Sequence, residues 1–195
     1  MLFSHHDHSH SKVLVVDDEP TSLMIMAESL SDLGEIVCCD NGAQAIEKAA
    51  FFQPDVILLD IEMPGMNGFE VCQKLKNNPK TAQSHVIFVT SHNEQIFEYQ
   101  SFASGGIDLI HKPVDLNICR LRVQNQLKLK HQEAQILAAK NDISKLVAQV
   151  PVYISYWSNT EENLFSNDET AHWFSKSSEQ MLGCFAKDVL PDELY

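Results

Sequence analysis

The chain has 195 residues, of which 44% are hydrophobic, and a formal net charge of −13 at pH 7. This length accommodates one full domain and a smaller second one, and the negative charge argues against nucleic-acid binding, which needs basic surface. No apolar run approaches the ~20 residues of a membrane span and the N-terminus lacks a secretion-signal pattern, so we expect a cytoplasmic protein that binds neither nucleic acid nor membrane.

The chain opens with a histidine-rich segment, residues 1–10, that contains His5, His6, His8 and His10. Such a cluster could bind zinc or copper, but no cysteine or spaced carboxylate completes a closed site. We therefore interpret residues 1–10 as a disordered tail.

Five short apolar runs follow, separated by segments with helical patterns. The runs are residues 12–16, 35–39, 55–60, 85–90 and 107–112. The third and fourth are almost continuously apolar, as strands covered on both faces are. Three of the helical segments begin with a potential N-cap residue, namely Asn41, Asn67 and Asn93. Alternating strands and helices on short connections predict an α/β fold, a doubly wound five-stranded parallel sheet.

Polar side chains end four of these predicted strands. Asp17 and Asp18 follow the first, Asp60 ends the third, Thr90 the fourth and Lys112 the fifth. Because ligands bind beyond the carboxyl ends of strands in open parallel sheets, we expect these groups to meet at one edge. The adjacent carboxylates repel each other, and a hard divalent cation, Mg²⁺ or Mn²⁺, would offset that repulsion.

These residues lie in motifs that closely resemble the receiver domain of two-component response regulators. The matching stretches are VVDDEP, LLDIEMPGMNG, VTS and HKP, within residues 11–128. The resemblance implies a flavodoxin-like fold in which Asp60 accepts a phosphoryl group from a sensor histidine kinase or phosphotransfer protein. It implies a switch with slow self-dephosphorylation rather than an enzyme.

The resemblance also implies a ligand set and roles for the other motif residues. Asp18, Asp60 and the backbone carbonyl of Glu62 would bind Mg²⁺, with Asp17 acting largely through water. Lys112 would pair with a phosphoryl oxygen, and Thr90 would donate a hydrogen bond to another. The Lys112–Pro113 peptide bond is expected to be cis.

Three further positions bear on the switch, one on its readout and two on the lifetime of the phosphoryl group. Where the family usually has Phe or Tyr, three residues before Lys112, this chain has Leu109. An aromatic gate is therefore in doubt, and we expect a different readout, for example through the long helix that follows. Glu62 and His92 would flank the path of hydrolytic water.

A helical pattern without Gly or Pro runs from residue 115 to residue 150. Its second part, residues 129–150, has an apolar heptad seam that predicts a coiled-coil signalling helix and a homodimer. The seam consists of Leu129, Ile136, Ala139, Ile143, Leu146 and Val150. The alternative is amphipathic packing against the chain's own second module.

Residues 151–195 resemble the front half of a PAS domain, with two strands and three short helical stretches. We expect its core to contain Trp157, Phe165, Trp173, Phe174 and Met181. The alternative is a small helical hairpin that only dimerises the chain. Proteins with this domain order commonly continue into a diguanylate cyclase, a phosphodiesterase or a histidine kinase, so a role in regulating a diguanylate cyclase is one interpretation.

Two other functions fit parts of the pattern. A dehalogenase-type aspartyl-phosphate hydrolase also uses Asp, Thr or Ser, Lys and Mg²⁺, but those enzymes have a D-x-D arrangement on the first strand. A pseudo-receiver that is never phosphorylated would act only as an interaction and dimerisation module, and Leu109 is the feature that favours it.

Overall fold

The computed structural model describes residues 11–92 and 95–189, and the chain divides into two compact units, residues 1–132 and 133–195. The histidine-rich segment and the predicted N-cap Asn93 lie outside the described residues. Each unit is described by itself.

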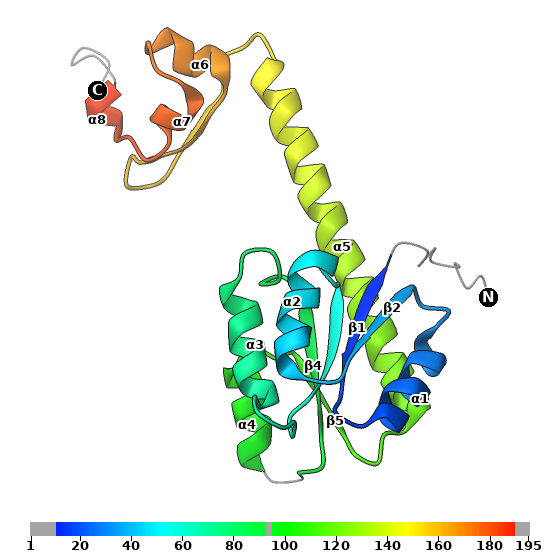
Figure 1. The fold of residues 1–195 in the computed structure, drawn as a ribbon. Coiled ribbons are helices and arrows are strands. Elements are labelled where there is room, and N and C mark those ends of the chain that lie inside the picture. Colours follow the sequence, from blue (N-terminus) through cyan, green and yellow to red (C-terminus); the bar gives the residue numbers. More distant parts are fainter. Residues whose placement is uncertain (1–10, 93–94, 190–195) are drawn as a thin grey trace. The chain divides into compact units, whose positions relative to one another are not determined.

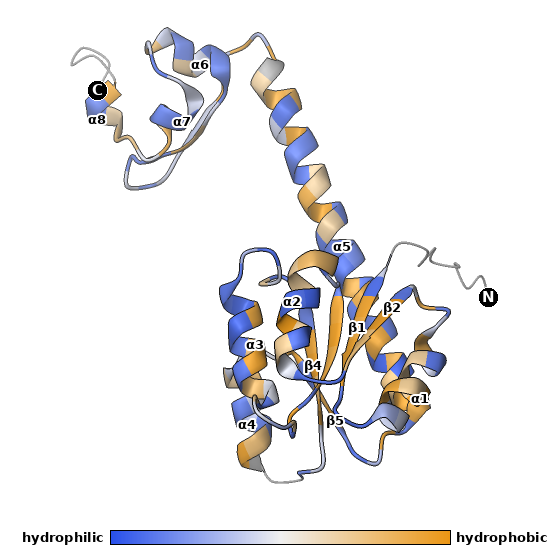
Figure 2. Cartoon of the chain, in the orientation of Figure 1, coloured by the Kyte–Doolittle hydropathy of each residue, from blue (hydrophilic) through white to orange (hydrophobic). Residues whose placement is uncertain are grey.

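The first unit contains a five-stranded parallel sheet in the order β2-β1-β3-β4-β5 (Figure 1). The predicted fold class is confirmed. The strands are rich in Val, Ile and Leu, which suit a sheet covered on both faces, and Figure 2 shows the resulting apolar sheet. Their bounds are β1 Lys12–Val16, β2 Glu35–Cys39, β3 Val56–Asp60, β4 His85–Thr90 and β5 Asp108–His111.

Helices cover both faces of this sheet. One core cluster joins the sheet to α2 and α3, and a second joins it to α1 and the first turns of α5. Two predicted caps are confirmed: Asn41 Oδ1 accepts from Gln44 N–H, and Asn67 forms a capping box with Glu70. The helices are α1 Pro20–Leu30, α2 Gly42–Phe52, α3 Gly68–Asn77, α4 Gln95–Ala103 and α5 Leu116–Gln149.

Helix α5 changes character along its length. Cys119, Val123 and Leu127 are buried against the sheet, whereas Ile136 and Ile143 are 70% and 61% exposed. Although α5 has 34 residues, no helix in the described part of the chain is both long and apolar enough to cross a membrane.

The second unit contains an antiparallel pair of strands, β6 Ser155–Trp157 and β7 Asn163–Ser166. Three short helices follow, α6 Asp168–Trp173, α7 Ser178–Met181 and α8 Ala186–Val189. Met181 is fully buried as predicted, but the prediction is wrong for Trp173, which is 61% exposed. The small unit offers too little apolar surface to enclose that ring, which packs instead beside Tyr153 and Phe174.

Candidate functional site

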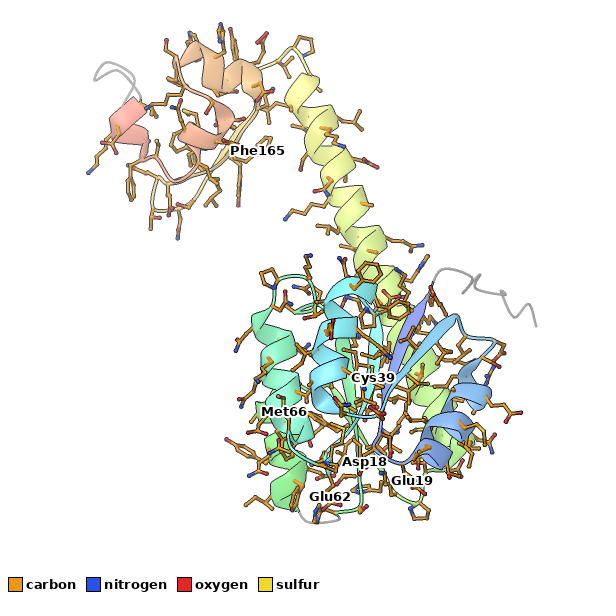
Figure 3. The ribbon with its side chains drawn as sticks, in the orientation of Figure 1. Asp18, Glu19, Cys39, Glu62, Met66 and Phe165 are labelled. Carbon is orange, nitrogen blue, oxygen red and sulfur yellow. The ribbon has the colours of Figure 1, made fainter. Side chains whose placement is uncertain are left out.

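The predicted site residues gather where the strand order reverses, at the carboxyl ends of β1 and β3. Asp17 and Asp18 follow β1 and Asp60 ends β3, while Thr90 ends the neighbouring β4. Figure 3 shows Asp18 and Glu62 at this same end of the sheet. A crevice at such a switch point is the usual ligand site of open α/β sheets.

Three carboxylates form an acidic cluster in this crevice. One oxygen from each of Asp17, Asp18 and Asp60 lies within 4.8 Å of the others. Asp17 and Asp60 are buried and Asp18 is exposed, so the cluster is open to solvent on one side. Asp17 Oδ1 accepts from the Glu19 N–H at 2.9 Å, which fixes the side chain at the start of α1.

The Lys112 ammonium lies between the two buried acids. Its Nζ is 2.7 Å from Asp60 Oδ2 and 3.0 Å from Asp17 Oδ2. Burial raises the pKa of Asp60, and the Lys112 ammonium opposes that rise. Burial lowers the pKa of Lys112, but the carboxylates of Asp60 and Asp17 raise it by more, so its pKa is above the ordinary lysine value.

The acidic cluster has the chemistry of a divalent-cation site. Asp17 Oδ2 is buried and forms an ion pair with Lys112, but it accepts no hydrogen bond of normal geometry. The one Lys112 ammonium is shared between this oxygen and Asp60, with Asp18 close by, so it compensates only part of the negative charge of the cluster. Carboxylate oxygens at one open edge are the ligands that Mg²⁺ prefers, so the residues present fit such an ion.

Thr90 and the end of β5 complete the crevice. The Thr90 side chain is fully buried, and its Oγ1 accepts from the His92 N–H at 3.0 Å. The Lys112 N–H donates to the Thr90 carbonyl, which joins the ends of β4 and β5. The Lys112–Pro113 bond is cis, as predicted. Leu109 pairs with Phe88 in the sheet and is buried in the core.

Sequence reasoning missed the role of Gly68, at the start of α3. A Cβ atom there would lie 2.3 Å from the Asp60 backbone oxygen, so only glycine lets α3 begin this close to the acidic cluster. The signal was present in the N-G pair that begins the helix. Sequence reasoning also gave no role to Phe97 and His111, which both contact His92.

The predicted coiled-coil residues lie apart from the acidic cluster. Leu129, Ala139 and Leu146 are exposed on α5, like Ile136 and Ile143. Val150, which follows the last residue of α5, is 38% exposed. These side chains form an apolar stripe along α5.

Comparison with known proteins adds three likenesses. The family of response regulator receiver domains matches residues 13–124. The chain is 35% identical over 136 residues to a probable cyclic di-GMP phosphodiesterase of Vibrio cholerae. The aligned region covers 70% of this chain and 31% of that protein. It is 36% identical over 121 residues to response regulator PleD of Caulobacter vibrioides, covering 62% and 27%.

The first unit also resembles solved receiver structures. The chemotaxis protein CheY4 of Vibrio cholerae matches with a TM-score of 0.57 and 25% identity, covering 60% of this chain and 98% of that one. The chain spans less than a third of the length of the two curated relatives, so their likeness concerns one part of each.

Proposed function

This chain belongs to the response regulator receiver family, and on that basis we propose that it is a two-component switch whose Asp60 accepts a phosphoryl group. The donor would be a phosphohistidine on a sensor histidine kinase or phosphotransfer protein. The observation that carries this proposal is the placement of Asp60, whose Oδ2 lies 2.7 Å from Lys112 Nζ inside the acidic cluster.

In the proposed reaction an Asp60 carboxylate oxygen attacks phosphorus, the bond from phosphorus to the histidine nitrogen breaks, and imidazole leaves. Lys112 is near enough to Asp60 to pair with a phosphoryl oxygen. Thr90, at the end of the adjacent strand, would turn its hydroxyl to donate to another. The protein's contribution is positioning and charge compensation.

A divalent cation belongs to this proposal. Asp18, Asp60 and the backbone carbonyl of Glu62 would hold Mg²⁺ or Mn²⁺, with Asp17 acting through water. When bound, the cation supplies positive charge that offsets the charge on the transferred phosphoryl group.

A phosphorylation experiment tests the proposal. The full chain is incubated with acetyl phosphate and Mg²⁺, and its intact mass is compared with that of Asp60→Asn. We expect a gain of one phosphoryl group that depends on Asp60. Rapid multiple turnover would instead support an aspartyl-phosphate hydrolase, and no labelling would support a pseudo-receiver.

We propose a domain order of receiver (11–128), signalling helix (129–150) and PAS-like module (151–195). The exposed apolar stripe on α5 supports dimerisation through the helix. One of the two curated relatives is named as a probable cyclic di-GMP phosphodiesterase. An enzyme that acts on cyclic di-GMP is one output that the whole protein could control. We assign no such activity to the described residues.

A further inference from the structure

We propose that His92 transmits a change in the position of the Thr90 side chain to helix α4, through the stack of its ring on Phe97. This route would take the part of the Phe or Tyr that the family usually has where this chain has Leu109. This inference rests on the proposed function and names how the same site is read out.

His92 contacts four groups from four parts of the first unit. Its backbone N–H donates to Thr90 Oγ1 at 3.0 Å, and its carbonyl accepts from His111 Nδ1 at 3.1 Å. Its ring Nε2 donates to Glu62 Oε1 at 2.8 Å. Its ring lies parallel to that of Phe97, with centroids 3.9 Å apart and planes 3° apart.

The described side chains of helix α4 make few large apolar contacts with the rest of the unit, and the contacts of Phe97 are the principal ones. Among the α4 side chains that the structure describes, Phe97 is the large apolar one that is not exposed, whereas Ile96, Tyr99 and Phe102 are more than half exposed. The Phe97 ring also stacks on Phe69 of α3. An element with so few apolar contacts is easily displaced.

The Thr90 hydroxyl joins this arrangement to Asp60. Thr90 ends β4, next to the strand that ends in Asp60. If the hydroxyl turns toward a phosphoryl group on Asp60, the His92 N–H loses its acceptor and the backbone at His92 must shift. Because the ring is tied to Phe97, that shift is passed to the start of α4.

Because Leu109 has no ring, the aromatic contact that the resemblance implies is missing, and the contacts of His92 offer another route from Thr90 to α4. Leu109 is buried beside Phe88 and is much smaller than the Phe or Tyr of the resemblance. The rings of Phe88, Phe69, Phe97 and His92 lie next to one another in that order, with centroid separations from 3.9 to 6.5 Å. This series of rings ends at His92, whose backbone N–H donates to Thr90 Oγ1.

Hydrogen exchange measured by mass spectrometry tests the inference on the full chain. Exchange over residues 95–104 is compared with and without acetyl phosphate and Mg²⁺, and is normalised to the fraction of chains labelled at Asp60. We expect a phosphorylation-dependent change in wild type that is lost in His92→Ala and in Phe97→Leu. His92→Phe retains a ring for the stack and should retain the change.

Tyr99→Leu is the matched control, because Tyr99 is a 75% exposed aromatic on the same helix. A purely structural role of His92 would raise exchange in both states of His92→Ala and preserve their difference, which would overturn the inference. A wild-type chain that is not labelled at Asp60 would overturn the proposed function and this inference together. Labelling with an undiminished α4 response in Phe97→Leu would overturn this inference alone.

Discussion

At the scale of single residues, the acidic cluster lowers the stability of the folded first unit but provides carboxylates that can bind a positively charged ligand. Asp17 is fully buried with one oxygen that accepts no hydrogen bond, and Asp60 is buried beside it. Lys112 compensates only part of this negative charge, because one ammonium faces two carboxylates while Asp18 adds a third nearby. A ligand that brings positive charge should therefore stabilise the folded first unit.

Mg²⁺ should raise the unfolding temperature of the first unit. At a free concentration a hundredfold above its dissociation constant, the expected gain in the free energy of unfolding is about 2.7 kcal/mol. Asp18→Asn should lose most of this gain, and Glu47→Gln, an exposed acid on α2, should keep it. Differential scanning calorimetry measures both effects, and a wild-type transition that does not respond to Mg²⁺ would contradict the predicted cation site.

The buried cysteines give a second prediction at this scale. Burial raises the pKa of both Cys39 and Cys119 to about 11, which keeps these thiols protonated and unreactive at neutral pH. Native protein treated with iodoacetamide should remain unmodified at both, while the partly exposed Cys184 reacts. Their modification should rise in denaturant or as the pH approaches about 11. Peptide mass spectrometry measures the modification at each cysteine, and early modification of Cys119 would contradict this prediction.

At the scale of elements, most of the first unit could be predicted from the sequence. The apolar runs of β3 and β4 identified buried strands, and Asn41 and Asn67 marked helix starts, because these signals are local. The contacts of His92 with Glu62, Phe97 and His111 could not be predicted, since they depend on how a loop, a helix and a strand that are distant in sequence meet. The acidic cluster was predictable despite its long sequence separations, because strand ends in a parallel sheet share one edge.

Helix α5 carries the prediction that belongs to this scale. A helix as exposed as its second half is marginal alone, so its apolar stripe should find a partner. In a parallel pair with Leu129, Ile136 and Ile143 in the seam, Lys128 of one helix and Glu133 of the other would occupy facing flanking positions of opposite charge.

Ile143→Asp should therefore shift the mass measured by light scattering from dimer toward monomer, because it places a charge in the seam. Ser144→Asp adds the same charge one residue away, outside the seam, and should leave the mass unchanged. Equal masses for wild type and Ile143→Asp would remove the coiled-coil proposal and leave packing within the chain as the interpretation of the stripe.

At the scale of the whole molecule, α5 belongs to both units, since it begins in the first and ends in the second. Within the second unit, the Asn167 side chain forms hydrogen bonds with the C-terminal end of α5. The side chain is 1% exposed, and its Nδ2 donates to the carbonyls of Val147 and Val150, at the end of the helix, and of Val152. Its Oδ1 accepts from Ile154 N–H and from the N–H and hydroxyl of Thr170, at the start of α6.

The last prediction follows from this one side chain. Asn167→Ala would remove the side-chain partner of the Val152 carbonyl and of the Ile154 and Thr170 N–H groups, which are partly or fully buried, at a cost of up to about 1–3 kcal/mol each. The second unit should therefore unfold at clearly lower denaturant concentration. Both tryptophans, Trp157 and Trp173, lie in the second unit, so tryptophan fluorescence follows that unit alone. The calorimetric transition of the first unit should stay in place, because none of the groups bonded to Asn167 belongs to it. Asn159→Ala is the matched control, because Asn159 is exposed in the same unit. If the fluorescence midpoint of Asn167→Ala equals that of the wild type, Asn167 does not stabilise the end of α5.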